Sequence, residues 1–340
     1  MIIKLTDEIN RKEKASIISK VSDLNFKTRE VKTQKSEYLI GIGTAEFDIR
    51  EIGHLPGVED IHVVSDNFKL VSRKWKVKTT TIHLGHDISI GRENFSVMAG
   101  PCAIEGEKQI LETLSHLRNN GVKIMRGGVF KPRSSPYSFR GLGMDGLKLW
   151  YEAAKEYGIK IITEVMQVSQ VEEMYDFVDI YQVGARNTQN FNLLDELGKV
   201  DKPVMIKRGI SGTIDELLYS AEYVFSGGNE NLILCERGIR TYETASRNTL
   251  DLNAIPILKD KTHLPVIADP SHGIGIRKYI EPLALASIMA GADGVIYELH
   301  KTPEEAASDG YQSLNFFESE ELIRKMRKVY EMKRQLNQNH

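Results

Sequence analysis

Beyond residue 95, short apolar runs typical of β-strands alternate with longer amphipathic segments typical of helices. The predicted strands are Phe95–Ala99, Lys123–Val129, Lys160–Val165, Asp179–Val183, Pro203–Lys207, Leu232–Glu236, Pro265–Asp269 and Gly294–Leu299. The predicted helices include Glu107–Asn119, Gly146–Tyr157, Val168–Phe177, Phe191–Leu197, Ile214–Phe225, Ile280–Ala290 and Asn315–Lys333. Strands that alternate with helices imply parallel pairing. Eight such repeats over about 245 residues have the length of a (β/α)8 TIM barrel.

A doubly wound open sheet is the alternative architecture for this alternation of strands and helices. It is weakened because no Gly-x-Gly-x-x-Gly turn follows the first strand of the repeat.

Residues 1–65 form a separate pattern, in the order β-α-β-β-α-β. Its predicted elements are Ile2–Leu5, Asn10–Leu24, Lys27–Val31, Tyr38–Ile42, a short helix near Phe47–Ile52, and Val58–Val64. This order predicts a small ferredoxin-like α+β domain that packs on a larger one. We interpret residues 66–80 as a linker or an exposed edge. The barrel domain then spans 81–340, preceded by a β-hairpin of Thr81–Leu84 and Ile88–Ile90 that turns at His86-Asp87.

The composition is that of an ordinary soluble protein: 340 residues, 41% hydrophobic, 27% charged, with a formal net charge of −2. This balance argues against general nucleic-acid binding. No apolar run approaches the roughly 20 residues that span a bilayer, and the first residues lack a signal-peptide pattern. Cys102 and Cys235 do not make a disulfide framework. We therefore expect a cytoplasmic protein with reduced thiols.

One loop is unusually basic. From Thr113 to Met144 there is no carboxylate, whereas six cations occur: Arg118, Lys123, Arg126, Lys131, Arg133 and Arg140. Cations on a loop rich in Gly and Ser suit an anionic ligand, because Arg offers forked donors and Lys a compact charge. An ordinary solvated loop explains the composition equally well.

Further polar residues follow the predicted strands, at the end of a barrel where chemistry collects. Cations follow four of the strands: Arg126 and Lys131, Arg186, Lys207 with Arg208, and Arg237. Buried cations need a partner or an anion, since desolvating them alone costs several kcal/mol. A ring of them favours an anion site over a purely structural network of ion pairs.

A second set consists of Cys102, His272, Glu298 and Asp309, from the ends of the first, seventh and eighth strands. One thiolate, one imidazole and two carboxylates suit Mn, Fe, Co or Zn better than Mg or Ca. Each residue alone is more often structural, and no local motif joins them. Cys235 is interpreted as a small apolar residue of a packed strand.

Several motifs occur together in order: Ala99-Gly-Pro-Cys102, Arg126-Gly-Gly, Lys131-Pro-Arg133-Ser-Ser-Pro-Tyr-Ser-Phe, Gly184-Ala-Arg186-Asn, Ile206-Lys207-Arg208-Gly, Cys235-Glu-Arg237-Gly and Asp269-Pro-Ser-His272. They resemble the 3-deoxy-D-arabino-heptulosonate 7-phosphate (DAHP) synthases, in the class related to 3-deoxy-D-manno-octulosonate 8-phosphate synthase. The similarity covers about residues 82 to 335. The N-terminal module resembles, in pattern only, the ferredoxin-like regulatory domain that some members carry.

The resemblance implies condensation of phosphoenolpyruvate with erythrose 4-phosphate, with release of phosphate, as the first step of the shikimate pathway to chorismate and the aromatic amino acids. Phosphoenolpyruvate would be held by Arg126, Lys131, Arg186, Lys207 and Arg237. The aldose and its phosphate would be held by Arg133, Ser134 and Ser135. The metal would be bound by Cys102, His272, Glu298 and Asp309, so that Cys102 and His272 serve catalysis through it. Lys131 is the hypothetical proton donor to the new alkoxide.

The resemblance also implies inhibition by an aromatic amino acid, tyrosine or phenylalanine, at the N-terminal module, and a homotetramer. The nearest alternative is the octulosonate synthase, whose acceptor is arabinose 5-phosphate. In that family the loop reads Lys-Ala-Asn-Arg-Ser-Ser, where this chain has Lys131-Pro132-Arg133-Ser134-Ser135. The rigid proline shortens the acceptor site and favours the four-carbon sugar. A non-catalytic regulatory protein that binds an anionic metabolite is the alternative of another class.

Overall fold

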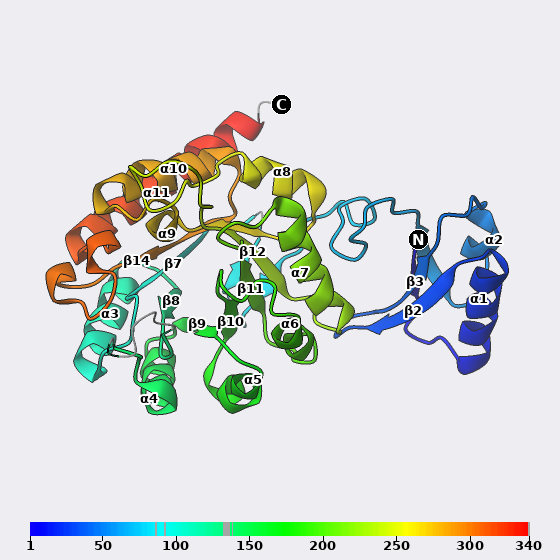
Figure 1. The fold of residues 1–340 in the computed structure, drawn as a ribbon, viewed down its shortest axis with the longest axis horizontal. Coiled ribbons are helices and arrows are strands. Elements are labelled where there is room, and N and C mark those ends of the chain that lie inside the picture. The colour runs from blue at the N-terminus through cyan, green and yellow to red at the C-terminus, as the bar shows by residue number, and fades with distance from the viewer. Residues whose placement is uncertain (86, 92, 132–136, 138, 339–340) are drawn as a thin grey trace.

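The computed structural model of the chain describes residues 1–85, 87–91, 93–131, 137 and 139–338. Eight parallel strands close into a barrel, as the sequence predicts (Figure 1). They are β7 (Ser96–Gly100), β8 (Ile124–Gly127), β9 (Lys160–Val165), β10 (Ile180–Val183), β11 (Val204–Lys207), β12 (Leu232–Glu236), β13 (Val266–Ala268) and β14 (Gly294–Glu298). The open-sheet alternative is excluded, because β14 pairs with β7 along its whole length.

Helices surround the barrel (Figure 1). They are α3 (Glu107–Asn119), α4 (Gly143–Glu156), α5 (Ser169–Met174), α6 (Phe191–Leu197), α7 (Ile214–Ser226), α8 (Ala254–Lys261), α9 (Pro270–Ile274), α10 (Ile280–Ala290) and α11 (Phe316–Gln338), with 3₁₀ turns at Tyr175–Phe177, Arg277–Tyr279, Pro303–Glu305 and Gly310–Gln312. A local signal marks the start of α7, where Thr213 and Glu216 form a reciprocal capping box. The sequence prediction missed α8 and α9. No helix in the described residues is long and apolar enough to cross a membrane.

The interior of the barrel is filled by one buried apolar side chain from each strand: Met98, Ile124, Ile162, Ile180, Met205, Ile233, Ile267 and Ile296. Cys235 belongs to the same cluster and is fully buried, which confirms its interpretation as a core residue. The predicted hairpin, β5 (Ile82–His83) and β6 (Ser89–Ile90), adds Ile82, Leu84 and Ile90 to this core. His86 of its turn lies outside the described residues. Because these side chains fill the barrel interior, a binding site is expected at the carboxyl ends of the strands.

The N-terminal module is an antiparallel sheet with two helices, in the predicted order β-α-β-β-α-β. Its elements are β1 (Ile2–Leu5), α1 (Arg11–Asp23), β2 (Lys27–Lys32), β3 (Glu37–Ile42), α2 (Arg50–Gly53) and β4 (Val58–His62). The strand order is β2-β3-β1-β4. The ferredoxin-like assignment and the domain limits at 65 and 80 stay predictions.

The module touches the barrel through the turn between β2 and β3, which reaches the edge of the barrel in Figure 1. Thr33 donates a hydrogen bond to Glu230, and Gln34 accepts one from the Glu230 backbone N–H. The interpretation of residues 66–80 as a linker or an exposed edge stays a prediction, although part of the segment is packed against the barrel. Its apolar residues Phe68, Leu70 and Val71 are buried. They pack beside α7, whose Glu222 accepts both the Leu70 and Val71 N–H groups.

Candidate active site

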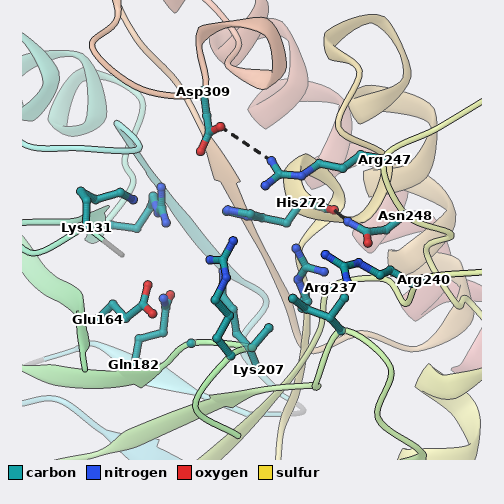
Figure 2. Close-up of a pocket in the computed structure, with 15 residues that line it drawn as sticks. Lys131, Glu164, Gln182, Lys207, Arg237, Arg240, Arg247, Asn248, His272 and Asp309 are labelled. Atoms are coloured by element: carbon teal, nitrogen blue, oxygen red, sulfur yellow. Dashed lines mark hydrogen bonds and ion pairs between the residues drawn. The ribbon is translucent and has the colours of Figure 1, made fainter. Parts of the chain in front are cut away.

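A cavity of about 190 Å³, open to solvent, lies at the carboxyl ends of the barrel strands. Seven of the residues predicted from the sequence line it: Arg126, Lys131, Arg186, Lys207, Arg237, His272 and Asp309. Figure 2 shows Lys131, Lys207, Arg237, Arg240 and Arg247 around the side chain of His272. Residues that are far apart in the chain are therefore brought together at one cationic opening.

Three arginines of the cavity have no carboxylate within ion-pair distance among the described residues: Arg186, Arg237 and Arg240. Arg237 is the most demanding of them, because only 5% of its surface is exposed. Burial lowers the pKa of the Arg237 guanidinium, although Asp269 opposes this effect. A guanidinium desolvated in this way needs an anion, which the cavity can admit.

Two other cations of the cavity are paired within the protein. Arg126 donates to Glu298 at 2.7 Å, and Lys207 pairs with Asp269. Both pairs are buried. Arg208, the neighbour of Lys207, does not line the cavity; it pairs with Glu236 at 2.9 Å and Asp251 at 2.8 Å. Arg208 is thus part of a structural ion-pair network.

The candidate metal site lies beside these cations. Cys102, Glu298 and Asp309 have ligand atoms that all lie within 4.8 Å of one another. Nε2 of His272 lies 3.5 Å from Oε1 of Glu298, so the fourth predicted residue is adjacent. Nδ1 of His272 lies 2.8 Å from Oδ2 of Asp269. If that nitrogen carries the proton, it donates to Asp269 and the Nε2 lone pair faces the site.

The electrostatics of the site also favour a cation. Burial raises the pKa of the Cys102 thiol to about 12, with Glu298 adding to the effect. Burial alone would raise the pKa of Glu298, but His272, Arg126 and Lys131 together lower it to about 2. A metal ion would supply the charge that the thiol needs in order to lose its proton. The donor set of thiolate, imidazole and carboxylate fits a transition metal.

Local backbone features place two of these ligands. Asp269 caps the five-residue helix α9 by accepting the His272 N–H at 3.0 Å, and proline occupies its first turn. Asp309 has φ +52°, a left-handed conformation that is uncommon for a residue other than glycine. Such strain is typical of functional sites.

Lys131 bridges the cation floor and the candidate metal site. Its Nζ donates to the Cys102 carbonyl at 2.9 Å and lies 3.1 Å from the Cys102 Sγ. Gly141 has φ +96°, and a Cβ there would lie 2.0 Å from the Val129 carbonyl oxygen. The predicted acceptor residues Arg133, Ser134 and Ser135 lie outside the described residues, as does Pro132.

Five polar side chains that line the cavity are not among those predicted: Glu164, Gln182, Arg240, Arg247 and Asn248. Glu164 and Gln182 lie side by side in Figure 2, from neighbouring strands β9 and β10. Polar residues within otherwise apolar strands were a usable signal. Gly184 makes room for Glu164, because a Cβ there would lie 1.9 Å from the Glu164 carboxylate.

Known proteins resemble this chain over almost its whole length. The model of the DAHP synthetase I family matches residues 74–335. The chain is 43% identical over 330 residues to a phospho-2-dehydro-3-deoxyheptonate aldolase of Thermotoga maritima, covering 97% of each chain. The crystal structure of the phospho-2-dehydro-3-deoxyheptonate aldolase (DAHP synthase) from that organism aligns with a TM-score of 0.78 at 42% identity, again over 97% of both chains. A 2-dehydro-3-deoxyphosphooctonate aldolase of Syntrophobacter fumaroxidans is 31% identical over 264 residues, which is 72% of this chain and 91% of the relative.

Proposed function

The chain belongs to the DAHP synthetase I family, and we propose that it joins phosphoenolpyruvate to D-erythrose 4-phosphate. The reaction consumes water and yields 3-deoxy-D-arabino-heptulosonate 7-phosphate and inorganic phosphate, the first step of the shikimate pathway. One observation carries the proposal. Arginines without carboxylate partners among the described residues share a cavity with Lys131 and with a ligand set for a divalent metal.

Phosphoenolpyruvate binds on the cationic floor made by Arg126, Lys131, Arg186, Lys207 and Arg237. Its phosphate and carboxylate together carry several negative charges, which match a floor with more cations than acids. Arg237 gains the anion that its burial demands. Arg126 and Lys207 are held in place by Glu298 and Asp269, so they require little reorganisation when the substrate arrives.

Cys102, His272, Glu298 and Asp309 hold a divalent Mn, Fe, Co or Zn ion. Three of them converge within 4.8 Å, and Asp269 orients the ring of the fourth. When bound, the ion supplies Lewis acidity toward the aldehyde oxygen of the second substrate.

The chain's own residues direct the chemistry. C3 of phosphoenolpyruvate forms a bond to the aldehyde carbon, and Lys131 donates a proton to the resulting alkoxide oxygen. Water then adds at C2 and loses a proton, which the Glu164 carboxylate of the cavity can take, while the neighbouring Gln182 can accept a hydrogen bond. The tetrahedral carbon loses phosphate by C–O cleavage, and Arg186 and Arg237 stabilise the departing charge.

The acceptor is expected to be the four-carbon aldose, because proline follows Lys131 in this chain. The octulosonate relatives, at about 31% identity, are more distant than the heptonate relative at 43%. We would incubate the full chain with phosphoenolpyruvate and equal amounts of erythrose 4-phosphate and arabinose 5-phosphate. Mass spectrometry should find the seven-carbon product in large excess, whereas a dominant eight-carbon product would overturn the assignment.

The same assay decides against a non-catalytic regulatory protein. That alternative predicts binding of phosphoenolpyruvate without release of phosphate. Release that depends on the aldose, together with metal analysis of the purified protein, supports an enzyme and identifies its metal.

Regulation and assembly complete the proposal. The N-terminal module binds tyrosine or phenylalanine and thereby inhibits a cytoplasmic homotetramer. Deletion of residues 1–65 should abolish inhibition and spare catalysis. The cut is placed there because Phe68, Leu70 and Val71 pack beside α7 and must remain. Inhibition that survives the deletion, or a dimer by sedimentation, contradicts the corresponding part.

A further inference from the structure

Arg247, on the loop between β12 and α8, links the cavity to two of the candidate metal ligands. Its Nη1 donates to Oε1 of Gln312 at 2.7 Å and to the hydroxyl of Tyr311 at 3.0 Å. The same nitrogen lies 3.7 Å from Oδ1 of Asp309, the contact drawn as a dashed line in Figure 2.

Gln312 connects Arg247 to Glu298 through hydrogen bonds to both residues. Its side chain is completely buried, and its Nε2 donates to Oε2 of Glu298 at 2.6 Å. An arginine can only donate, so the amide oxygen must face Arg247 and the amide nitrogen must face the carboxylate. Arg126 binds the other oxygen of Glu298. The orientation of this carboxylate is therefore fixed from both sides.

Asp309 is held through the same arginine. The Tyr311 hydroxyl, which accepts from Arg247, donates to Oδ1 of Asp309 at 3.2 Å. This leaves Oδ2 of Asp309 toward the Cys102 thiol, at 3.1 Å. The strained backbone of Asp309 therefore carries a side chain whose two oxygens face different partners.

The position of Arg247 is itself defined. Its N–H donates to the Ile274 carbonyl at 3.1 Å, next to the end of α9. Its side chain packs over Gly275, which has φ +70° and where a Cβ would come within 2.5 Å of the Arg247 Cβ. Helix α9 also carries His272, so one arginine touches the supports of three of the four ligands.

We propose that Arg247 and Gln312 are positioning residues that hold Glu298 and Asp309 ready to receive the divalent metal. This rests on the proposed function only in taking those two residues as ligands. Residues that orient metal ligands typically change metal affinity about 10- to 100-fold when they are replaced.

The chain provides a matched control in Arg240. It lies on the same loop and lines the same cavity, yet its side chain makes no hydrogen bond or ion pair within the described residues. Replacing Arg240 alters the charge of the cavity as much as replacing Arg247 does. Only the second replacement removes the contacts to Gln312 and Tyr311.

The experiment titrates Co²⁺ into the full chain after removal of metal by chelation. The thiolate-to-cobalt charge-transfer band reports on Cys102. Arg247→Met and Gln312→Met should each raise the Kd for Co²⁺ about 10- to 100-fold, while Arg240→Met leaves it unchanged. Arg247→Lys should recover part of the affinity. The double variant should bind as weakly as the weaker single variant, since both changes interrupt one chain of contacts.

Equal Kd values for Arg247→Met and the native chain overturn the proposal, as does an equal rise for Arg240→Met. Gln312 is buried, so thermal unfolding of each variant is measured first. Should Gln312→Met not fold, Arg247→Met decides, because about a third of the Arg247 side chain is exposed. The titration needs no turnover, so it gives its answer even if the chain forms no heptulosonate product.

Discussion

At the amino-terminal ends of the barrel strands the buried carboxylates Glu230 and Asp293 have partners, whereas at the carboxyl ends several cations have no carboxylate partner among the described residues. Glu230, just before β12, accepts from Thr33 at 2.6 Å and lies 3.9 Å from Lys76. Asp293, just before β14, pairs with Lys259 and accepts the Val266 N–H. At the opposite end of β12, Arg237 lines the cavity without a carboxylate partner.

Arg208 and Arg237 show what this difference means. Both are 5% exposed, so both have lost most of their hydration. The charge of Arg208 is compensated by ion pairs with Glu236 and Asp251, so this residue contributes to the stability of the fold. Arg237 has no such carboxylate partner among the described residues. A bound anion could therefore offset the free-energy cost of its desolvation. Burial alone therefore does not distinguish a structural arginine from a functional one; their ion-pair partners do.

The largest effect on catalysis is expected from replacing Lys131, which lines the cavity at the carboxyl ends of the strands. Lys131→Met removes the proposed proton donor, and general acid catalysis typically contributes about 10²- to 10⁴-fold. The single-turnover rate with both substrates bound should fall by that factor, while the free energy of unfolding changes little. A variant with a near-native single-turnover rate would show that another group donates the proton.

Arg208 and Arg237 can be compared directly by the same replacement. Arg208→Met leaves Glu236 buried without its cation and should lower the free energy of unfolding by about 3–5 kcal/mol. Arg237→Met strands no carboxylate, so it should keep that stability and raise the KM for phosphoenolpyruvate instead. Urea denaturation and steady-state kinetics on both variants check this. Equal loss of stability would mean that Arg237 is structural as well.

Much of this architecture could be predicted from the sequence. The predicted bounds of β9 and β12 agree with the structure, because each is a short apolar run between clear breaks. Helix α9 could not be predicted in the same way. It has only five residues, and Asp269-Pro-Ser-His272 has the composition of a loop. The placement of functional residues at strand ends followed from the barrel itself.

The pairing of the cations could not be predicted, because it depends on residues remote in the chain. Glu298, which pairs with Arg126, lies 172 positions away from it. Arg247 was missed for a related reason. Its loop has no periodic pattern of apolar residues that would indicate which side chains face the cavity. The different roles of Lys207 and Arg208 could have been predicted, because successive side chains near the end of a strand point to opposite faces.

A smaller effect is expected where the module meets the amino-terminal end. Thr33→Val removes the hydroxyl that donates to buried Glu230, and an unsatisfied buried acceptor typically costs about 1–3 kcal/mol. Stability should fall by this amount with no change in kcat or KM. Lys35→Ala is the control, because its bond to Asn231 at 3.1 Å is exposed and should contribute little. A change in KM for Thr33→Val would show that the two ends are coupled.

The effect that is smallest near neutral pH concerns His263, a buried ring at the amino-terminal end of the barrel. Its ring is fully buried between the Thr80 hydroxyl and the Leu70 carbonyl, and burial lowers its pKa from 6.5 to about 3. Above pH 6.5 the ring is neutral in both the folded and unfolded states. Below it the unfolded state binds a proton that the folded state refuses. Stability should therefore fall by up to about 1.4 kcal/mol per pH unit between pH 6.5 and 3 from this residue.

Urea denaturation of native and His263→Asn chains between pH 4.5 and 7 isolates the contribution of His263, since every other titrating group is common to both. The native curve should be steeper by roughly one proton, while the phosphoenolpyruvate KM stays the same in both chains. Parallel curves would mean that His263 can be protonated within the fold. A charge would then be tolerated at the amino-terminal end without an anionic partner, and the contrast with Arg237 would no longer distinguish the two ends of the barrel.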